Sequence, residues 1–247
     1  MQAPGIIIKS LHFDYDQSPL FTGVSAHFQA GQWHSILGSS GVGKSSLIKI
    51  MAGLLSHQTW QGEVMADDGL PLFSRIAWMA QDDLLMPWLS VLENICLGFQ
   101  LRGDLTPDVQ ESAMRLLKQV GLSGLGDRKP YQLSGGQRQR VALARTLLED
   151  KPIVLMDEPF SALDFATRLQ LQTLFIKLFR DKTVILITHD PLEALRLSQH
   201  IWVMQAQNQQ PASLVHMVNL SSDTPRSIDD PDVLKWQGVL LNQLSTV

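Results

Sequence analysis

A glycine-rich segment near the N-terminus of this 247-residue chain has the composition of a phosphate cradle. Residues 38–45 read Gly-Ser-Ser-Gly-Val-Gly-Lys-Ser and lie between an apolar run typical of a short strand and an amphipathic helix. Glycine permits backbone torsions that other residues resist, so main-chain N–H groups around Gly41 and Gly43 can approach an anion closely. Lys44 supplies a positive charge for β- and γ-phosphates, and Ser45 offers a hydroxyl to Mg²⁺. The alternative, a glycine turn that arose by chance, is disfavoured by the strand–loop–helix context.

A second glycine-rich segment could also present backbone N–H groups to an anion. Residues 133–137 read Leu-Ser-Gly-Gly-Gln and open a predicted helix over residues 135–148. The Ser134 hydroxyl is a natural helix cap, and an ordinary cap is the alternative interpretation. Two successive glycines, Gly135 and Gly136, are costly at a helix start unless another group must approach the backbone closely. The sequence therefore favours a second anion-facing helix end.

Two acids, Asp157 and Glu158, follow the buried apolar run of residues 152–156. Carboxylates at the end of a buried strand are costly unless they are paired. A Mg²⁺ ion reached by Asp157 would offset that cost, and Glu158 would then be placed to polarise an attacking water. A solvated pair of acids is the alternative, which the apolar run and the turn-fixing Pro159 disfavour.

Three single residues give weaker signals. Gln81 and His189 follow the predicted strands 74–79 and 183–188, and the ends of parallel strands converge on one crevice. Each could equally be a surface side chain, but convergence would bring both near the phosphate. Tyr15 lies in the predicted loop between the first two strands, where its ring could stack on adenine or pack against the sheet edge.

The alternation of strand and helix signals predicts an α/β fold. Apolar runs predict strands over residues 6–13, 24–28, 33–37, 62–65, 74–79, 152–156, 183–188 and 201–204. Helical periodicity predicts helices over residues 46–55, 91–97, 108–120, 135–148, 166–179, 191–197 and 233–244. Buried runs favour a parallel core sheet covered on both faces, and residues 82–150 predict an inserted helical subdomain. Residues 206–230 are polar and predict a surface excursion.

Composition narrows the class of protein. The net charge of −4 does not indicate the basic surface that binds nucleic acid. No segment reaches about 18 uninterrupted apolar residues, so we expect no membrane-spanning helix. The N-terminal residues show no secretory signal, and the single cysteine, Cys96, has the apolar context of a buried thiol in a reducing cytoplasm.

Together and in this order, the motifs closely resemble those of the ATP-binding cassette (ABC) family over about residues 11–204. The matching segments are the Walker A motif at 38–45, the Q-loop at Gln81, the signature motif at 133–137, the Walker B motif at 152–158, the D-loop at 161–164 and the switch histidine at His189. The resemblance implies a P-loop NTPase (RecA-like) fold, with a mostly parallel core sheet, an N-terminal antiparallel β part and an inserted α-helical subdomain. It implies one ABC ATPase domain over 1–247, with residues 1–81 and 151–247 as the core and 82–150 as the subdomain that carries the signature motif.

The resemblance also assigns roles to residues, with ATP and Mg²⁺ as cofactors. The nucleotide would be bound by Tyr15, Gly38, Ser39, Ser40, Gly41, Val42, Gly43, Lys44, Ser45 and Ser46. Mg²⁺ would be held by Ser45, Gln81 and Asp157, and the catalytic residues would be Glu158, His189 and Lys44. The residues that close over the ATP of a second copy would be Ser134, Gly135, Gly136 and Gln137, with Asp164 contacting across the interface.

The partners implied are a second copy of the chain on ATP binding, integral membrane permease subunits and, indirectly, a periplasmic or extracellular solute-binding protein, with no nucleic acid. The chain would lie peripherally on the cytoplasmic face of the inner (plasma) membrane, and residues 84–93 resemble part of the groove that receives the permease's coupling helix. One alternative is a soluble non-transport ABC ATPase, which usually has paired cassettes, a coiled coil or zinc motifs. Another is a non-hydrolysing regulator, against which Glu158 and His189 count.

A narrower resemblance concerns the transported solute. Residues 79–95 are similar to the corresponding segment of importer ATPases for nitrate, sulfonate, taurine and thiamine-precursor pyrimidines. The first expectation is hydroxymethylpyrimidine or a related thiamine precursor, followed by sulfonate, taurine or nitrate. Because the solute never touches this subunit, its chemistry leaves little imprint on the sequence.

Overall fold

The computed structural model describes residues 3–15, 18–56, 59–206 and 210–245, which form two compact units. The core unit comprises residues 1–76, 152–157 and 179–247, and the helical unit comprises residues 77–151 and 158–178. The sequence predicts a helical subdomain of residues 82–150 and assigns residues 158–178 to the core. The helical unit of the structure includes residues 158–178. The predicted domain boundaries therefore stay a prediction. No helix in the described ranges is long and apolar enough to cross a lipid bilayer.

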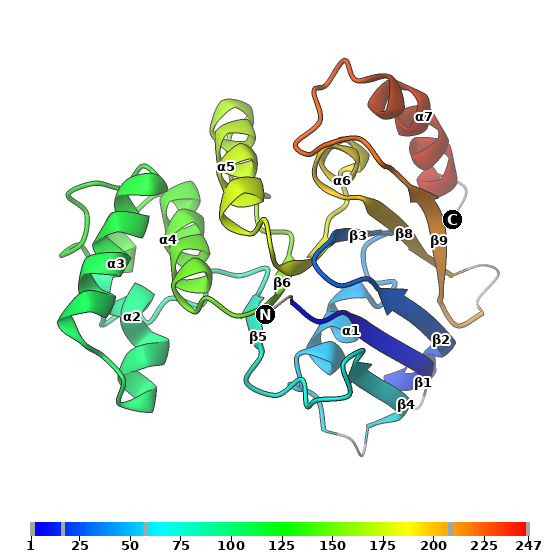
Figure 1. Cartoon of the computed structure of the whole chain (residues 1–247), viewed down its shortest axis with the longest axis horizontal. Coiled ribbons are helices and arrows are strands. Elements are labelled where there is room, and N and C mark those ends of the chain that lie inside the picture. Colours follow the sequence, from blue (N-terminus) through cyan, green and yellow to red (C-terminus); the bar gives the residue numbers. More distant parts are fainter. Residues whose placement is uncertain (1–2, 16–17, 57–58, 207–209, 246–247) are drawn as a thin grey trace. The chain divides into compact units, whose positions relative to one another are not determined.

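The core unit is built on a mostly parallel sheet (Figure 1). Its strands lie in the order β6 (Ile153–Asp157), β7 (Thr183–Ile187), β3 (Trp33–Leu37), β8 (His200–Gln205) and β9 (Ser213–Asn219). The first four run parallel to one another, and β9 runs antiparallel to β8. Every residue of β3, β6 and β7 is buried, as expected for a parallel sheet covered on both faces.

The edge strand β9 corrects the predicted surface excursion over 206–230. Its residues Ser213–Asn219 pair with His200–Gln205 of β8, and most of them are partly or fully exposed. A half-exposed edge strand needs no continuous apolar run, so its polar composition conceals it in the sequence.

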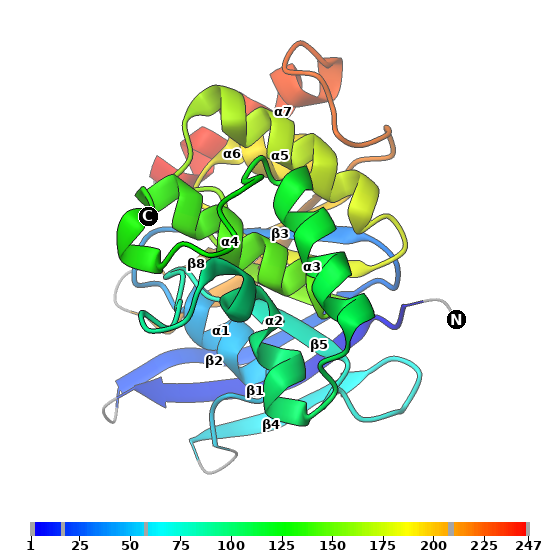
Figure 2. The same cartoon turned by 90° about the vertical axis from the view of Figure 1, so that its left-hand side faces the viewer.

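A second sheet in the core unit is antiparallel, with strand order β2 (Ser18–Phe28), β1 (Ile6–Tyr15) and β4 (Trp60–Ala66). Figure 2 shows these three strands side by side. The buried face of β1 carries Ile6, Ile8, Leu11 and Phe13, and the register shifts around Ser10, whose φ of 46° is left-handed. This bulge keeps the apolar residues on one face along a ten-residue strand.

The remaining helices of the core unit are α1 (Lys44–Met51), α6 (Pro191–Leu197) and α7 (Pro231–Ser245). Leu195 of α6 and both Val233 and Leu240 of α7 join a buried apolar cluster that also contains Leu37 and Val203 from the sheet. The C-terminal helix is therefore packed, through α6, onto the strand that leads into the glycine loop.

The helical unit contains β5 (Ile76–Met79), which starts at the boundary, α2 (Val91–Arg102), α3 (Pro107–Gln119), the short 3₁₀ helix η1 (Pro130–Gln132), α4 (Gly135–Leu148) and α5 (Phe165–Leu178). Helices α2, α3 and α4 pack against one another. A capping box joins Ser90 and Glu93 at the start of α2, and Thr106 caps α3. The predicted buried thiol, Cys96, lies within α2, where burial raises its pKa.

Three histidines form a stack on the core sheet. The rings of His34 on β3 and His200 on β8 lie almost parallel with centroids 4.7 Å apart, and His216 on β9 lies 3.3 Å from His200 (Nε2 to Nδ1). Because His200 Nε2 also meets the amide oxygen of Gln32, the bonds fit when His200 donates to Gln32 and accepts from His216. Burial lowers the pKa of His34 to about 3, and it also lowers the pKa values of His200 and His216.

We expect this stack to make the stability of the chain fall as the pH drops from 7 to 5. The pKa of His34 is about 3 in the folded chain against 6.5 for the free side chain, so between those values the unfolded chain binds more protons. His34 alone would remove about 2 kcal/mol of unfolding free energy between about pH 6.5 and 5. Urea unfolding at several pH values measures this slope. The His34→Gln variant should flatten it, and an equal slope in both proteins would contradict the assignment.

Candidate functional site

The predicted phosphate cradle connects β3 to α1 in the core unit. Helix α1 begins at Lys44, two residues earlier than predicted, with Gly43 as its N-cap at a left-handed φ of 112°. No side chain caps this helix end, so its first backbone N–H groups are available to an anion in the way the sequence predicts.

The shape of the cradle is imposed by the core beneath it. A Cβ atom on Gly38 would lie 2.4 Å from the backbone oxygen of Met204 on β8, so no side chain fits there. A Cβ on Gly43 would lie 3.1 to 3.2 Å from the side chains of Met204 and Leu20, and its φ of 112° strains any other residue, so this position also requires glycine. The loop is therefore held in place before any ligand arrives.

Lys44 is buried and folds back over the loop. Its ammonium donates hydrogen bonds of 2.8 Å to the backbone oxygens of Gly38 and Ser39. These bonds hold a full positive charge against the glycine loop, where a bound phosphate would meet it.

Asp157 and His189 lie at the same edge of the core sheet as the cradle. Asp157 ends β6, where it is buried and pairs in register with Ile187 of β7. Ile187 in turn pairs with Ile36 of β3, two residues before Gly38. Since parallel strands end on one side, the structure brings together three of the predicted positions: the cradle, the buried acid and the exposed His189 that follows β7.

Tyr15 is the last residue of β1 and pairs with Ser18 of β2, so it lies in a strand and not in the predicted loop, because the two strands extend further than their apolar runs. Its side chain is 65% exposed. Such exposure does not fit the alternative of a ring packed against the sheet edge. Stacking on adenine remains a prediction.

Gln81, Glu158, Asp164 and residues 134–137 belong to the helical unit, whose placement against the cradle is not described. Glu158 has a left-handed φ of 49°, a conformation that costs a non-glycine residue about 1 kcal/mol. Gln81 is exposed. Asp164 is also exposed, and its carboxylate accepts a 3.0 Å hydrogen bond from the backbone N–H of Thr167, which lowers the pKa of Asp164.

A buried residue that the sequence analysis missed, Gln139, holds the turn after Glu158. Its amide nitrogen donates to the backbone oxygen of Glu158 at 3.2 Å and to the Ser161 hydroxyl at 3.3 Å, and its oxygen accepts from the N–H of Ala162 at 2.9 Å. Gln139 lies on α4 and is only 4% exposed. The sequence held one sign of this role: Gln139 is a polar residue on the buried face of α4, one helical turn before the buried Leu143.

The two glycines at the start of α4 have different surroundings. A Cβ on Gly136 would lie 3.1 Å from the backbone oxygen of Ala162, so packing within the unit explains this glycine. A Cβ on Gly135 would meet nothing closer than 3.9 Å, so internal packing does not require that glycine. Ser134 also forms a capping box with Gln137, which means that the cap considered in the sequence analysis is present.

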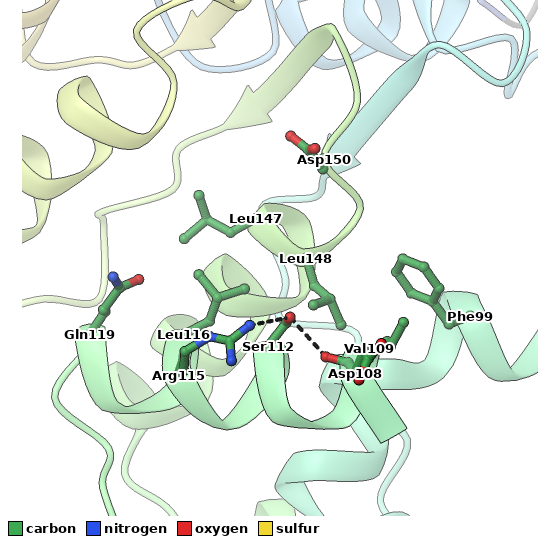
Figure 3. Close-up of a pocket in the computed structure, with 10 residues that line it drawn as sticks. All are labelled: Phe99, Asp108, Val109, Ser112, Arg115, Leu116, Gln119, Leu147, Leu148 and Asp150. Atoms are coloured by element: carbon green, nitrogen blue, oxygen red, sulfur yellow. Dashed lines mark hydrogen bonds between the residues drawn. The ribbon is translucent and has the colours of Figure 1, made fainter. Parts of the chain in front are cut away.

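A separate cavity of about 410 Å³ lies in the helical unit (Figure 3). It is lined by Phe99, Asp108, Val109, Ser112, Arg115, Leu116, Gln119, Leu147, Leu148 and Asp150. Arg115 and Ser112 are hydrogen-bonded to each other at its rim. The lining contains no residue of the predicted site.

Comparison with known proteins agrees with the geometry. A family model described as "ABC transporter" matches residues 21–161. The chain is 40% identical to an "Uncharacterized ABC transporter ATP-binding protein" of Haemophilus influenzae, over 96% of this chain and 97% of the relative. It is 37% identical to the "Aliphatic sulfonates import ATP-binding protein SsuB 1" of Pseudomonas syringae pv. syringae, over 96% and 94% of the two chains.

Solved structures give the same result. The chain is similar to MJ0796, a bacterial ABC transporter cassette solved as a dimer, with a TM-score of 0.72 and 32% identity over 80% of this chain and 93% of that chain. A post-hydrolysis dimer of the same cassette, bound to ADP and Pi, matches with a TM-score of 0.74 and 30% identity over 88% of this chain and 100% of that chain. The predicted fold class and family resemblance are confirmed.

We expect Lys44→Ala to lower ATP affinity at least about tenfold, because the positive charge held against the loop is lost while the glycine backbone is kept. Titration with a fluorescent ATP analogue measures the affinity. Exchange of the exposed Lys49 on the same helix for Ala should leave it unchanged. Equal affinity of Lys44→Ala and the parent chain would contradict the assigned cradle.

We expect Gln139→Leu to lower ATP turnover about tenfold with little change in ATP affinity, since the turn that follows Glu158 loses its side-chain support. Steady-state hydrolysis and nucleotide titration separate the two effects. Thr146→Val removes another buried hydrogen bond from α4, the one to the backbone oxygen of Ala142, and serves as the control. Equal turnover losses in the two variants would mean that Gln139 acts only through stability.

Proposed function

This chain belongs to the ABC transporter family and hydrolyses ATP, and we propose that it is the ATP-binding subunit of an importer that works as a homodimer on the cytoplasmic face of the inner (plasma) membrane. The observation that carries the dimer is the contrast between the two glycines of α4. Gly136 is needed for packing inside the unit, whereas a Cβ on Gly135 would meet only the end of the Arg138 side chain at 3.9 Å, as expected if a group from another molecule must approach it.

In this proposal one copy binds ATP with its core unit. Tyr15 stacks on the adenine, the backbone N–H groups of residues 38–46 contact the phosphates, and Lys44 neutralises their charge. Glu158 orients and polarises the attacking water, and His189 contacts the γ-phosphate.

The residues around the cradle also suit Mg²⁺, which is usually held by one or two carboxylates together with phosphate oxygens. The buried Asp157 is such a carboxylate, and α1, which carries Ser45, packs against β6, which ends at Asp157. The described residues contain no group of three or more His, Cys, Asp or Glu side chains arranged for a metal. Ser45, Asp157 and Gln81 would hold the ion, which would neutralise charge on the phosphates when bound.

The second copy would close the site. Its Ser134, Gly135, Gly136 and Gln137 would present the start of α4 to the γ-phosphate, and its exposed Asp164 would reach across the interface. The dimeric solved cassette to which this chain is similar supports this arrangement.

A cavity of about 480 Å³ in the helical unit supports the proposed permease partner. It is lined by Ala77, Trp78, Ala80, Leu84, Leu97, Gly98, Leu101, Arg145, Thr146 and Glu149. Leu84 begins the segment predicted to form the coupling groove, and Leu101 is 78% exposed on the wall of the cavity. Arg145 donates to the backbone oxygens of Asp83 and Leu84, which fixes the loop at the rim. An apolar helix turn with a polar rim contact would fit this surface.

For the transported solute we propose an aliphatic sulfonate. Relatives from Pseudomonas syringae, Rhodococcus jostii and Rhodopseudomonas palustris, 36 to 37% identical over nearly all of this chain, are named aliphatic sulfonate import proteins. Hydroxymethylpyrimidine, taurine and nitrate stay predictions.

We expect Glu158→Gln to keep ATP binding, abolish turnover and trap the dimer, because the amide cannot accept the water's proton while the phosphate contacts remain. Light scattering with Mg-ATP should report twice the mass of the monomer. A variant that stays monomeric under these conditions would count against the two-copy site.

We expect Leu101→Asp to abolish uptake of a labelled aliphatic sulfonate by cells, while the purified variant still hydrolyses ATP. Leu101 is exposed, so the chain should fold, but a charge on the wall would oppose an apolar partner. Met114→Asp, an exposed apolar position on α3 outside this cavity, is the matched control. Normal uptake by the Leu101 variant would exclude the groove, and uptake of labelled hydroxymethylpyrimidine instead would reassign the solute.

A further inference from the structure

Arg226 lies between β9 and α7 and is buried, with 2% of its surface exposed. All five of its guanidinium N–H groups are used. Nη1 donates to the backbone oxygens of Leu195 (2.7 Å) and Ser198 (2.8 Å), Nη2 donates to those of Leu220 (3.3 Å) and Ser222 (2.8 Å), and Nε donates to the Ser222 hydroxyl (2.7 Å). A fully satisfied buried guanidinium fixes its neighbours in one geometry.

Two of these five bonds, together with two bonds of the Arg226 backbone, join this residue to the C-terminal end of α6. Leu195 lies in the last turn of that helix and Ser198 is its C-cap. The backbone N–H of Arg226 also donates to the oxygen of Arg196 at 2.9 Å, and Arg196 returns a 3.0 Å bond from its Nε to the oxygen of Arg226. The last carbonyls of a helix lack internal partners and carry partial negative charge, so a cation from elsewhere in the chain satisfies both needs. We call this set of bonds the arginine clasp.

The clasp stabilises a helix that is too short to be stable by itself. Helix α6 has seven residues, and isolated helices of that length are unstable in water. His189 lies just before its N-cap, Asp190, whose carboxylate accepts from the N–H of Leu192 at 2.9 Å. A shift of α6 would therefore move the loop that carries His189.

The same end of α6 is tied to the strand that precedes the phosphate cradle. The Ser198 hydroxyl is 2.6 Å from the hydroxyl of Ser35 on β3, three residues before Gly38. Both groups are buried. The clasp thus anchors α6 at a fixed position relative to the cradle, within the core unit.

We propose that Arg226 is a positioning residue for ATP hydrolysis: the clasp fixes α6, and with it the His189 loop, against the strand that carries the cradle. This inference rests on the proposed role of His189. Because Arg226 touches neither cradle nor nucleotide, its loss lowers turnover and leaves ATP affinity in place. The C-terminal segment after β9 thereby controls the rate of hydrolysis from a distance.

The test compares Arg226→Lys with Ile8→Ala in the full-length chain. Lysine keeps the charge but cannot reproduce the planar fork, whereas Ile8 is a buried core residue of the antiparallel sheet and serves as a control for lost stability. Three quantities are measured: turnover at saturating Mg-ATP, affinity for a fluorescent ATP analogue, and hydrogen exchange of the amides of residues 189–198.

Arg226→Lys should lower turnover about tenfold, leave ATP affinity within about twofold and speed exchange in α6, while Ile8→Ala keeps turnover and α6 exchange close to those of the parent chain. Unchanged turnover in Arg226→Lys, unchanged exchange in residues 189–198, or an equal loss of turnover in Ile8→Ala would overturn the proposal.

Two further variants make the outcome decisive. If Arg226→Lys does not fold, the milder Ser222→Ala, which removes the acceptor of Nε, should still lower turnover about twofold and speed exchange in α6, and no change in either would overturn the clasp. His189→Ala tests the proposed function separately. Full activity of that variant contradicts the role of His189, whereas an inactive His189→Ala beside a fully active Arg226→Lys overturns the clasp alone.

Discussion

The site depends on how β3 ends. This strand is buried along its whole length between β7 and β8, so its last residue, Leu37, cannot move without disturbing the core sheet. Gly38 follows at once, so close to the oxygen of Met204 that no side chain fits. Gly43 then turns the chain through a left-handed conformation into α1, and Lys44 folds back onto the loop. Packing beneath the loop therefore fixes the backbone that would bind the anion. The binding of a phosphate then loses little free energy to ordering this loop.

Most of the parallel sheet was predictable because its signals are local. Strands β3, β6 and β7 are short apolar runs bounded by turn residues, and such runs mark buried strands wherever they occur. The half-exposed β9 and the N-terminal half of β2 were missed for one reason. Each lies at the end of its sheet in the strand order and pairs with the strand directly before it in the sequence, and an edge strand carries polar residues that resemble a loop.

The same distinction applies to the site. The cradle, the acids after β6 and the start of α4 are runs of consecutive residues, so their spacing alone indicates their chemistry. Gln139 and Arg226 do not belong to a run of consecutive residues of this kind. Gln139 bonds to residues 19 to 23 positions away, and the two Arg226 bonds to the end of α6 span 28 to 31 positions. Residues that position others act through tertiary contacts, and one sequence does not display those contacts.

Two of the exposed functional positions, and the residue next to a third, cap a helix. Ser134, Asp164 and the residue after His189 each accept a backbone N–H in the first turn of α4, α5 and α6 respectively. A cap of this kind contributes about 1 kcal/mol and fixes the backbone of the residue that makes it. The capping residue keeps further hydrogen-bonding capacity, because a hydroxyl can still donate its proton and a carboxylate can accept further bonds. These exposed groups are thus held at the N-terminal ends of helices. Gln139, which bonds to the turn before α5, and the arginine clasp at the C-terminal end of α6 therefore help to decide where they point.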